Sequence, residues 1–143
     1  MCAAHATVRG LLYEVTGQAG TVVIDMEAGL EHLSRGTPRY VDTLLLVAEP
    51  YFKSMETAAR SKAMAEELGI ARVLAVANKI RGPRDAEAMR GFFPRVGLPL
   101  LAFIPADEMI LEADQLGRAP LDHDGASPAV MEIARLADAL STS

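Results

Sequence analysis

Short apolar runs of strand length alternate along this chain with segments long enough to form helices. The runs cover residues 22–24, 44–47, 73–77 and 100–104. Continuous apolar runs of this kind are typical of strands that are buried on both faces of a parallel sheet. Because successive parallel strands are joined by right-handed crossovers, the alternation predicts an α/β fold. We expect a three-layer sandwich with a mostly parallel sheet of about four strands.

Helical patterns fill the segments between and around these runs. The expected helices cover residues 1–17, 51–68, 85–93 and 108–116, and a last one opens at Ser127-Pro128. Two of these helices have a cap in the sequence, since Asp107 and Ser127 are residue types that accept hydrogen bonds from the first turn. Residues 120–122, which read PLD, are expected to form a surface loop.

Length and composition predict one globular domain over residues 1–143, because 50% hydrophobic residues are ample for a packed core. The net charge of −5, with no basic cluster, argues against a nucleic-acid partner. No apolar run approaches the roughly 20 residues of a membrane span, so no membrane is expected either. A single cysteine excludes an internal disulfide. With no secretory pattern at Met1, these features favour the cytoplasm.

The first candidate site follows the first apolar run. Asp25 comes directly after it, and open α/β sheets place their ligands at this end of their strands. Gly29 lies four residues on, where a small residue lets the backbone approach a phosphate closely. Asp25 has two interpretations from these residues. It either caps a following helix or orients water around the magnesium ion of a nucleotide.

A longer string decides how this site is interpreted. Residues 25–36 read DMEAGLEHLSRG. This string resembles the switch II region of the deviant-Walker P-loop ATPases, the MinD/ParA/ArsA class. Within that class it looks most like the CooC type, the nickel-insertion ATPases that mature carbon-monoxide dehydrogenase. The resemblance implies a partial P-loop NTPase fold, ATP with magnesium as cofactor, and Asp25, Glu27 and Gly29 as the catalytic switch II residues.

A second candidate site follows the third apolar run, at Asn78 and Lys79. A side-chain amide offers one acceptor and two donors, which can pair with the N6 and N7 edge of an adenine. Closing a turn is the ordinary alternative for an asparagine. The resemblance implies that Asn78 recognises the nucleotide base, with Lys79 beside it. It also implies that Pro105 and Asp107, in an I-P-x-D string, lie near the adenine, although helix capping is the stronger expectation for Asp107.

The chain also contains a candidate metal ligand, Cys2, three residues before His5. A thiolate and an imidazole both suit nickel or zinc. An ordinary terminal thiol and a surface histidine are the alternative. The resemblance implies that Cys2 matches the second cysteine of a Cys-x-Cys pair, which in the CooC type forms a metal site at a homodimer interface. No residue two positions before Cys2 exists in this sequence.

The phosphate-binding string of this ATPase class, G-K-G-G-x-G-K-[ST], does not occur in these 143 residues. Its backbone N–H groups and lysine hold the phosphates. The nearest candidate, GQAG at residues 17–20, lacks both the spacing and the lysine. The resemblance therefore implies the C-terminal part of a P-loop NTPase domain, and we expect no ATP hydrolysis by this chain alone.

Three functions stay open at this stage. The chain is part of a nickel-insertion ATPase that serves a carbon-monoxide dehydrogenase-like client, or a binding or regulatory module without a P-loop, or an inactive folded fragment. The resemblance implies ATP with magnesium and nickel or zinc for the full-length family, and binding of no cofactor by this chain alone stays open. An exposed sheet edge favours pairing with another chain. We therefore expect a homodimer, formed edge to edge or through residues 1–17.

Overall fold

The computed structural model describes residues 21–26 and 41–141. Its centre is a parallel sheet with the strand order β1-β2-β3. The strands are β1 (Thr43–Ala48), β2 (Arg72–Ile80) and β3 (Leu100–Pro105). The helices are α3 (Phe52–Glu67), α4 (Pro83–Phe92), α5 (Glu108–Gln115), α6 (Pro120–Asp124) and α7 (Pro128–Ser141), with a 3₁₀ helix, η2 (Phe93–Val96), after α4.

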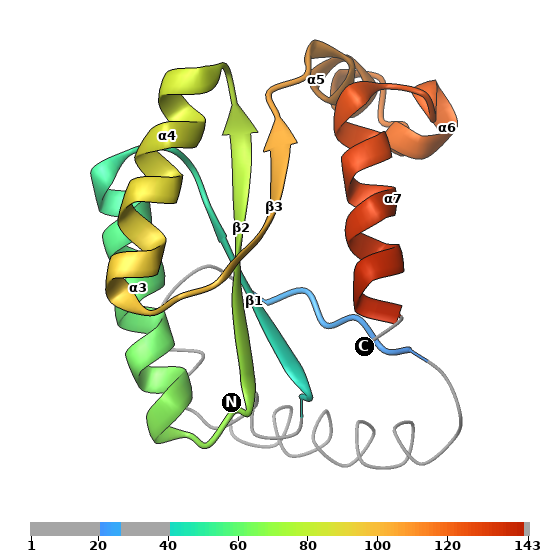
Figure 1. Cartoon of the computed structure of the whole chain (residues 1–143). Helices are drawn as coiled ribbons and strands as arrows, with labels where there is room; N and C mark the ends of the chain where they lie inside the picture. The colour runs from blue at the N-terminus through green and yellow to red at the C-terminus, as the bar shows by residue number, and fades with distance from the viewer. Residues whose placement is uncertain (1–20, 27–40, 142–143) are drawn as a thin grey trace.

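Helices cover both faces of the sheet, so the expected three-layer α/β sandwich is confirmed (Figure 1). Between the sheet and the layer of α3 and α4, a core forms around Met89, Phe93 and Leu98, whose side chains are fully buried. On the opposite face, α7 packs its Ala129 against Val76 and Ile104. Removing such side chains from water is the main force that holds a sheet and its helices together.

The prediction of a strand at residues 22–24 is wrong. Residues 21–26 contain no strand, and the side chain of Val23 is 89% exposed. A short apolar run becomes a strand only when its backbone pairs with a neighbouring strand, and in the described part of the chain this segment pairs with none. The described sheet therefore has three strands rather than about four.

Two other boundaries differ from the expectation. Residues 120–122 form the start of α6 rather than a loop, because Pro120 lies in the first turn of the helix, where its missing N–H is not needed. Strand β2 continues past residue 77 to Ile80, with an irregular register against β3 between Ala77 and Ile80. Asn78 and Lys79 thus lie inside the last part of this strand, where its pairing is disturbed.

Candidate functional site

The three parallel strands end at the same edge of the sheet, because parallel strands share one direction (Figure 1). Glu49 follows β1, Asn78 and Lys79 lie near the end of β2, and Pro105 ends β3. The backbone N–H of Ala106 donates to the carbonyl of Ile80 (2.9 Å) and so ties the ends of β2 and β3 together. This edge brings together the polar residues that the sequence places after separate strands.

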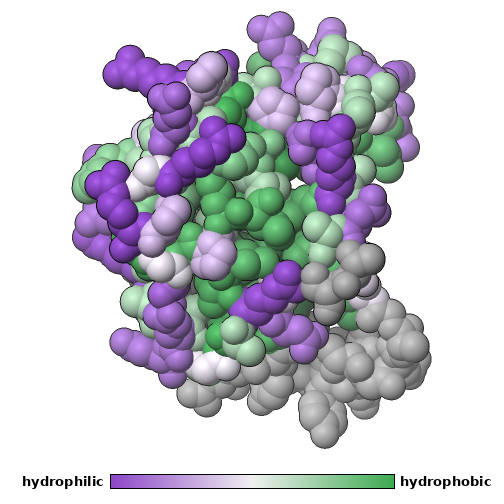
Figure 2. Space-filling view, in the orientation of Figure 1, coloured by the Kyte–Doolittle hydropathy of each residue, from purple (hydrophilic) through white to green (hydrophobic). Residues whose placement is uncertain are grey.

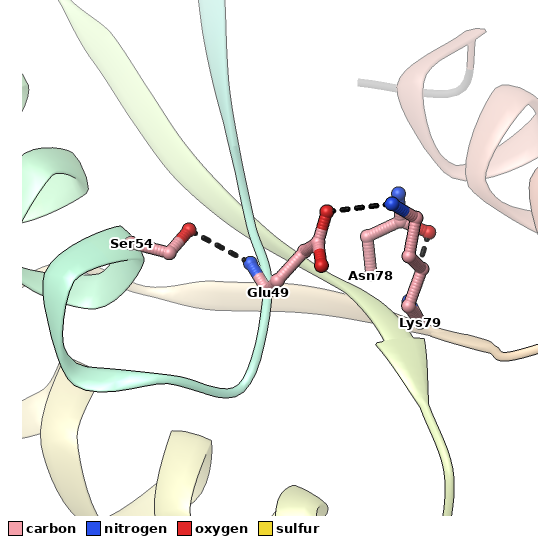
Figure 3. Close-up of polar contacts among 4 residues, drawn as sticks. All are labelled: Glu49, Ser54, Asn78 and Lys79. Atoms are coloured by element: carbon pink, nitrogen blue, oxygen red, sulfur yellow. Dashed lines mark hydrogen bonds and ion pairs between the residues drawn. The ribbon is translucent and has the colours of Figure 1, made fainter.

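A small polar cluster joins the ends of β1 and β2 (Figure 3). Lys79 Nζ lies 2.7 Å from Glu49 Oε1, and the backbone N–H of Lys79 donates to Asn78 Oδ1 at 3.0 Å. The backbone N–H of Glu49 donates in turn to Ser54 Oγ in α3, at 2.9 Å. These contacts fix the asparagine amide, the lysine ammonium and the glutamate carboxylate relative to one another.

Lys79 adopts a left-handed backbone conformation with φ +56°, and it is the sole residue other than glycine with positive φ in the described part of the chain. This conformation is unfavourable for an L-residue by about 1–2 kcal/mol. The ion pair with Glu49 is partly exposed, and pairs of this kind contribute about 0–1 kcal/mol. The ion pair therefore offsets part of the backbone strain rather than all of it.

The side chain of Asp107 accepts hydrogen bonds from the first turns of two helices, α5 and α7. Its Oδ1 accepts from the backbone N–H of Met109 at 3.0 Å, and its Oδ2 accepts from the backbone N–H of Ala129 at 3.0 Å. The hydrogen bond from Ala129 is the main cause that lowers the pKa of Asp107 from 3.8; burial opposes it, and bonds from Met109 and the Ser127 hydroxyl add to it. The predicted capping role is confirmed, whereas a contact between Asp107 and adenine stays a prediction.

Pro105 lies in different surroundings. It lines a shallow groove of about 520 Å³ between the outer edge of β3 and α7, together with Phe103, Met131 and Arg135. Hydrophobic side chains gather on this face between the helices of the two layers (Figure 2). Asn78 and Lys79 do not line this groove. The structure therefore places the four residues that were predicted to lie near adenine at the carboxyl ends of the strands, without gathering them into one pocket.

Most of the residues predicted for switch II and for metal binding lie outside the described part of the chain. Asp25 is exposed, in the segment 21–26. Glu27, Gly29 and Cys2 lie outside the described residues. Within residues 21–26 and 41–141, no group of three or more metal-ligating side chains comes together, and no helix is long and apolar enough to cross a membrane.

The sequence reasoning missed two members of the cluster, Glu49 and Ser54. The signal of Glu49 was similar to that of Asp25, since its carboxylate follows an apolar run after one intervening residue, Ala48. The partner of Glu49, Lys79, is 30 residues away in the chain. Only the parallel pairing of β1 with β2 brings the two side chains together.

Two relatives by sequence carry an indication of function. The chain is 41% identical over 123 residues to the carbon monoxide dehydrogenase accessory protein CooC of Rhodospirillum rubrum, a match that covers 85% of this chain and 46% of that protein. It is 37% identical over 138 residues to an uncharacterised ATP-binding protein of Methanocaldococcus jannaschii, covering 95% of this chain and 52% of that protein. The chain thus spans about half the length of these curated relatives. No family model matches it.

Solved structures agree on the fold. The cell division protein MinD of Aquifex aeolicus superimposes with a TM-score of 0.78 at 19% identity, over 97% of this chain and 59% of MinD. A ParA family ATPase of Chlorobium tepidum gives a TM-score of 0.75 at 20% identity, over 90% of this chain and 54% of that ATPase. Over the part of these proteins that it spans, the chain is therefore of the CooC type in sequence, and it has the fold of the MinD and ParA proteins.

Proposed function

We propose that this chain carries the base-recognition edge and the switch II segment of a CooC-type ATPase, which delivers nickel to a carbon-monoxide dehydrogenase-like enzyme. The observation that carries this proposal is the 41% identity to the CooC accessory protein along 85% of the chain. The polar edge supports it, because Asn78 lies at the carboxyl end of β2, where open parallel sheets bind their ligands.

The proposed roles divide between two parts of the chain. Asn78 pairs with the adenine edge, while Lys79 and Pro105 flank the base and Asp107 holds the following helices in place. Asp25, Glu27 and Gly29 form switch II, whose carboxylate would orient water around the magnesium ion of ATP. The bound magnesium would neutralise charge on the phosphates. Nickel is a cargo in this proposal, and Cys2 is its candidate ligand.

The affinity for ATP provides a direct test. The sequence holds no G-K-G-G-x-G-K-[ST] string. Base recognition alone supplies a few hydrogen bonds of about 1 kcal/mol each. We therefore expect adenosine, AMP and Mg-ATP to bind this chain with similar, weak affinities in a titration followed by nuclear magnetic resonance (NMR). Asn78→Ala should abolish the binding, and the exposed control Thr57→Ala should leave it unchanged.

Two results would speak against the proposal. If the wild-type chain shows no saturable change with adenosine at millimolar concentration, it does not recognise the base. If Mg-ATP binds in the micromolar range, far more tightly than adenosine, the phosphates have a binding site that the sequence motif does not reveal. The absent phosphate string also supports a second candidate, a binding or regulatory module that reads only the base. Equal affinities without ATP hydrolysis would be its signature.

The metal and dimer proposals are tested together. We infer a homodimer, since in the described residues β1 and β3 each pair on one side alone and Val47, near the end of β1, is 61% exposed. Light scattering should give about twice the monomer mass of 15.3 kDa. Nickel that co-purifies with the dimer should be lost in Cys2→Ala. Retention of the metal in that variant would exclude Cys2 as a ligand.

A further inference from the structure

The amide of Asn78 has a defined orientation because the backbone N–H of Lys79 donates to its Oδ1 at 3.0 Å. If the amide were flipped, its own NH₂ group would face the N–H of Lys79, and two donors would oppose each other. The Lys79 N–H therefore decides which end of the amide carries the acceptor. This orientation matters for function if Asn78 reads a base, so the inference rests on the function proposed above.

The fixed amide presents a particular pattern to a ligand. One lone pair of Oδ1 is used by Lys79, which leaves one acceptor site and two N–H donors. A purine edge that offers a 6-amino donor beside the N7 acceptor matches this pattern. A 6-oxo purine such as inosine offers two acceptors at the same positions, so its O6 would face Oδ1. The orientation thus favours adenine over a 6-oxo purine.

The position of the Lys79 N–H depends in turn on the left-handed backbone of that residue, with φ +56°. The side chain of Lys79 is held by Glu49 across the ends of two strands, and the backbone of Glu49 is held by Ser54 of α3. Figure 3 shows this chain of contacts from α3 to Asn78. We propose that Lys79, held by Glu49, is a positioning residue that orients the Asn78 amide for a 6-aminopurine.

The chain suits a sharp test, because Asn78 is its single asparagine and Gln18 and Gln115 are its two glutamines. The side-chain amide region of a ¹⁵N NMR spectrum therefore contains three signals, and Asn78→Asp assigns one of them. We would titrate adenosine and inosine into wild type, Glu49→Ala, and a charge-swapped double variant with Glu49→Lys and Lys79→Glu. Glu66→Ala, which breaks the exposed ion pair with Lys62 within α3, is the matched control.

We expect wild type to prefer adenosine over inosine by about tenfold, the effect of one hydrogen bond replaced by an opposed pair of acceptors. Glu49→Ala should reduce this preference to about twofold and shift the Asn78 amide signal. The charge swap should restore both, and Glu66→Ala should change neither. A merely structural ion pair would alter the unfolding temperature and leave the ratio of the two affinities unchanged.

Each other outcome has a defined meaning. An adenosine preference that is the same in wild type and Glu49→Ala overturns the positioning role, even if adenosine binds well. Absence of binding by wild type to either nucleoside refutes the proposed base recognition. The positioning role is then judged on the protein without ligand. An Asn78 amide signal that is unchanged in Glu49→Ala overturns it, and a signal that moves and returns in the charge swap supports it.

Discussion

Phe93 is the largest fully buried side chain in the described part of the chain, and its truncation should test how the α3 and α4 layer is held on the sheet. The residue opens η2 directly after α4, and its ring meets that of Phe92 edge to face, with ring centres 5.5 Å apart. Phe92 is only half-buried. The two neighbours therefore share one aromatic contact and differ in burial.

The expected magnitudes follow from this difference. Phe93→Ala should lower the free energy of unfolding by about 3–5 kcal/mol, since it leaves a cavity in the core. Phe92→Ala should lower it by about 1–2 kcal/mol, because less apolar surface is lost. Both variants lose the same ring–ring contact, so this contact does not contribute to the difference between them.

Urea unfolding followed by circular dichroism measures these free energies. For a domain of this size, Phe93→Ala should also lower the unfolding temperature by roughly 10–20 °C. If Phe92→Ala destabilises the protein as much as Phe93→Ala does, the packing described for this layer is wrong. Phe93→Leu, which keeps most of the volume, should recover more than half of the loss if the cavity is its cause.

Three further predictions concern other parts of the fold. Asp107→Asn should destabilise the protein at pH 7. Because the folded-state pKa of Asp107 is lowered, the carboxylate stabilises the fold above about pH 3.8, and this contribution disappears as the pH falls through the folded-state pKa. Urea unfolding should therefore show the free energies of unfolding of the two proteins converging below pH 3.8. Gly97→Ala, at φ +66°, should lower the free energy of unfolding by about 1–2 kcal/mol. Gly82→Ala should change it little, because Gly82 has an extended φ and an added Cβ would meet no atom within 4 Å beyond its chain neighbours. Val76→Thr, at 3% exposure, should lower the unfolding temperature clearly. Val23→Thr, at 89% exposure, should change the free energy of unfolding by less than about 0.5 kcal/mol, and equal effects of these two variants would contradict the described burial.

The sequence predicted those strands whose apolar runs pair with a neighbour in the sheet. The runs at residues 44–47, 73–77 and 100–104 all lie within strands of the sheet. The run at residues 22–24 has the same local pattern and forms no strand. Pairing with a neighbouring backbone decides between these outcomes, and pairing is not encoded in the run itself.

At the candidate site, too, some contacts could be predicted from the sequence and others could not. The capping role of Asp107 on α5 was predictable, because the acceptor and the Met109 N–H lie two residues apart. The second bond of Asp107, to Ala129, joins residues 22 positions apart and depends on how α7 packs. The pairing of Glu49 with Lys79 likewise depends on the register between β1 and β2. Local chemistry was thus readable from the sequence, and contacts between elements were not.

The structure separates what holds the fold from what orients the site. Buried side chains such as Phe93 contribute several kcal/mol each to the stability of the fold. At the edge, the strain of Lys79 and the attraction of Glu49 are both small, at most about 2 kcal/mol, and the strain is the larger of the two. A substitution at Glu49 can therefore change the orientation of Asn78 while the fold persists. A core substitution should instead weaken the whole domain and, as long as the domain stays folded, leave the preference between purine bases as it was.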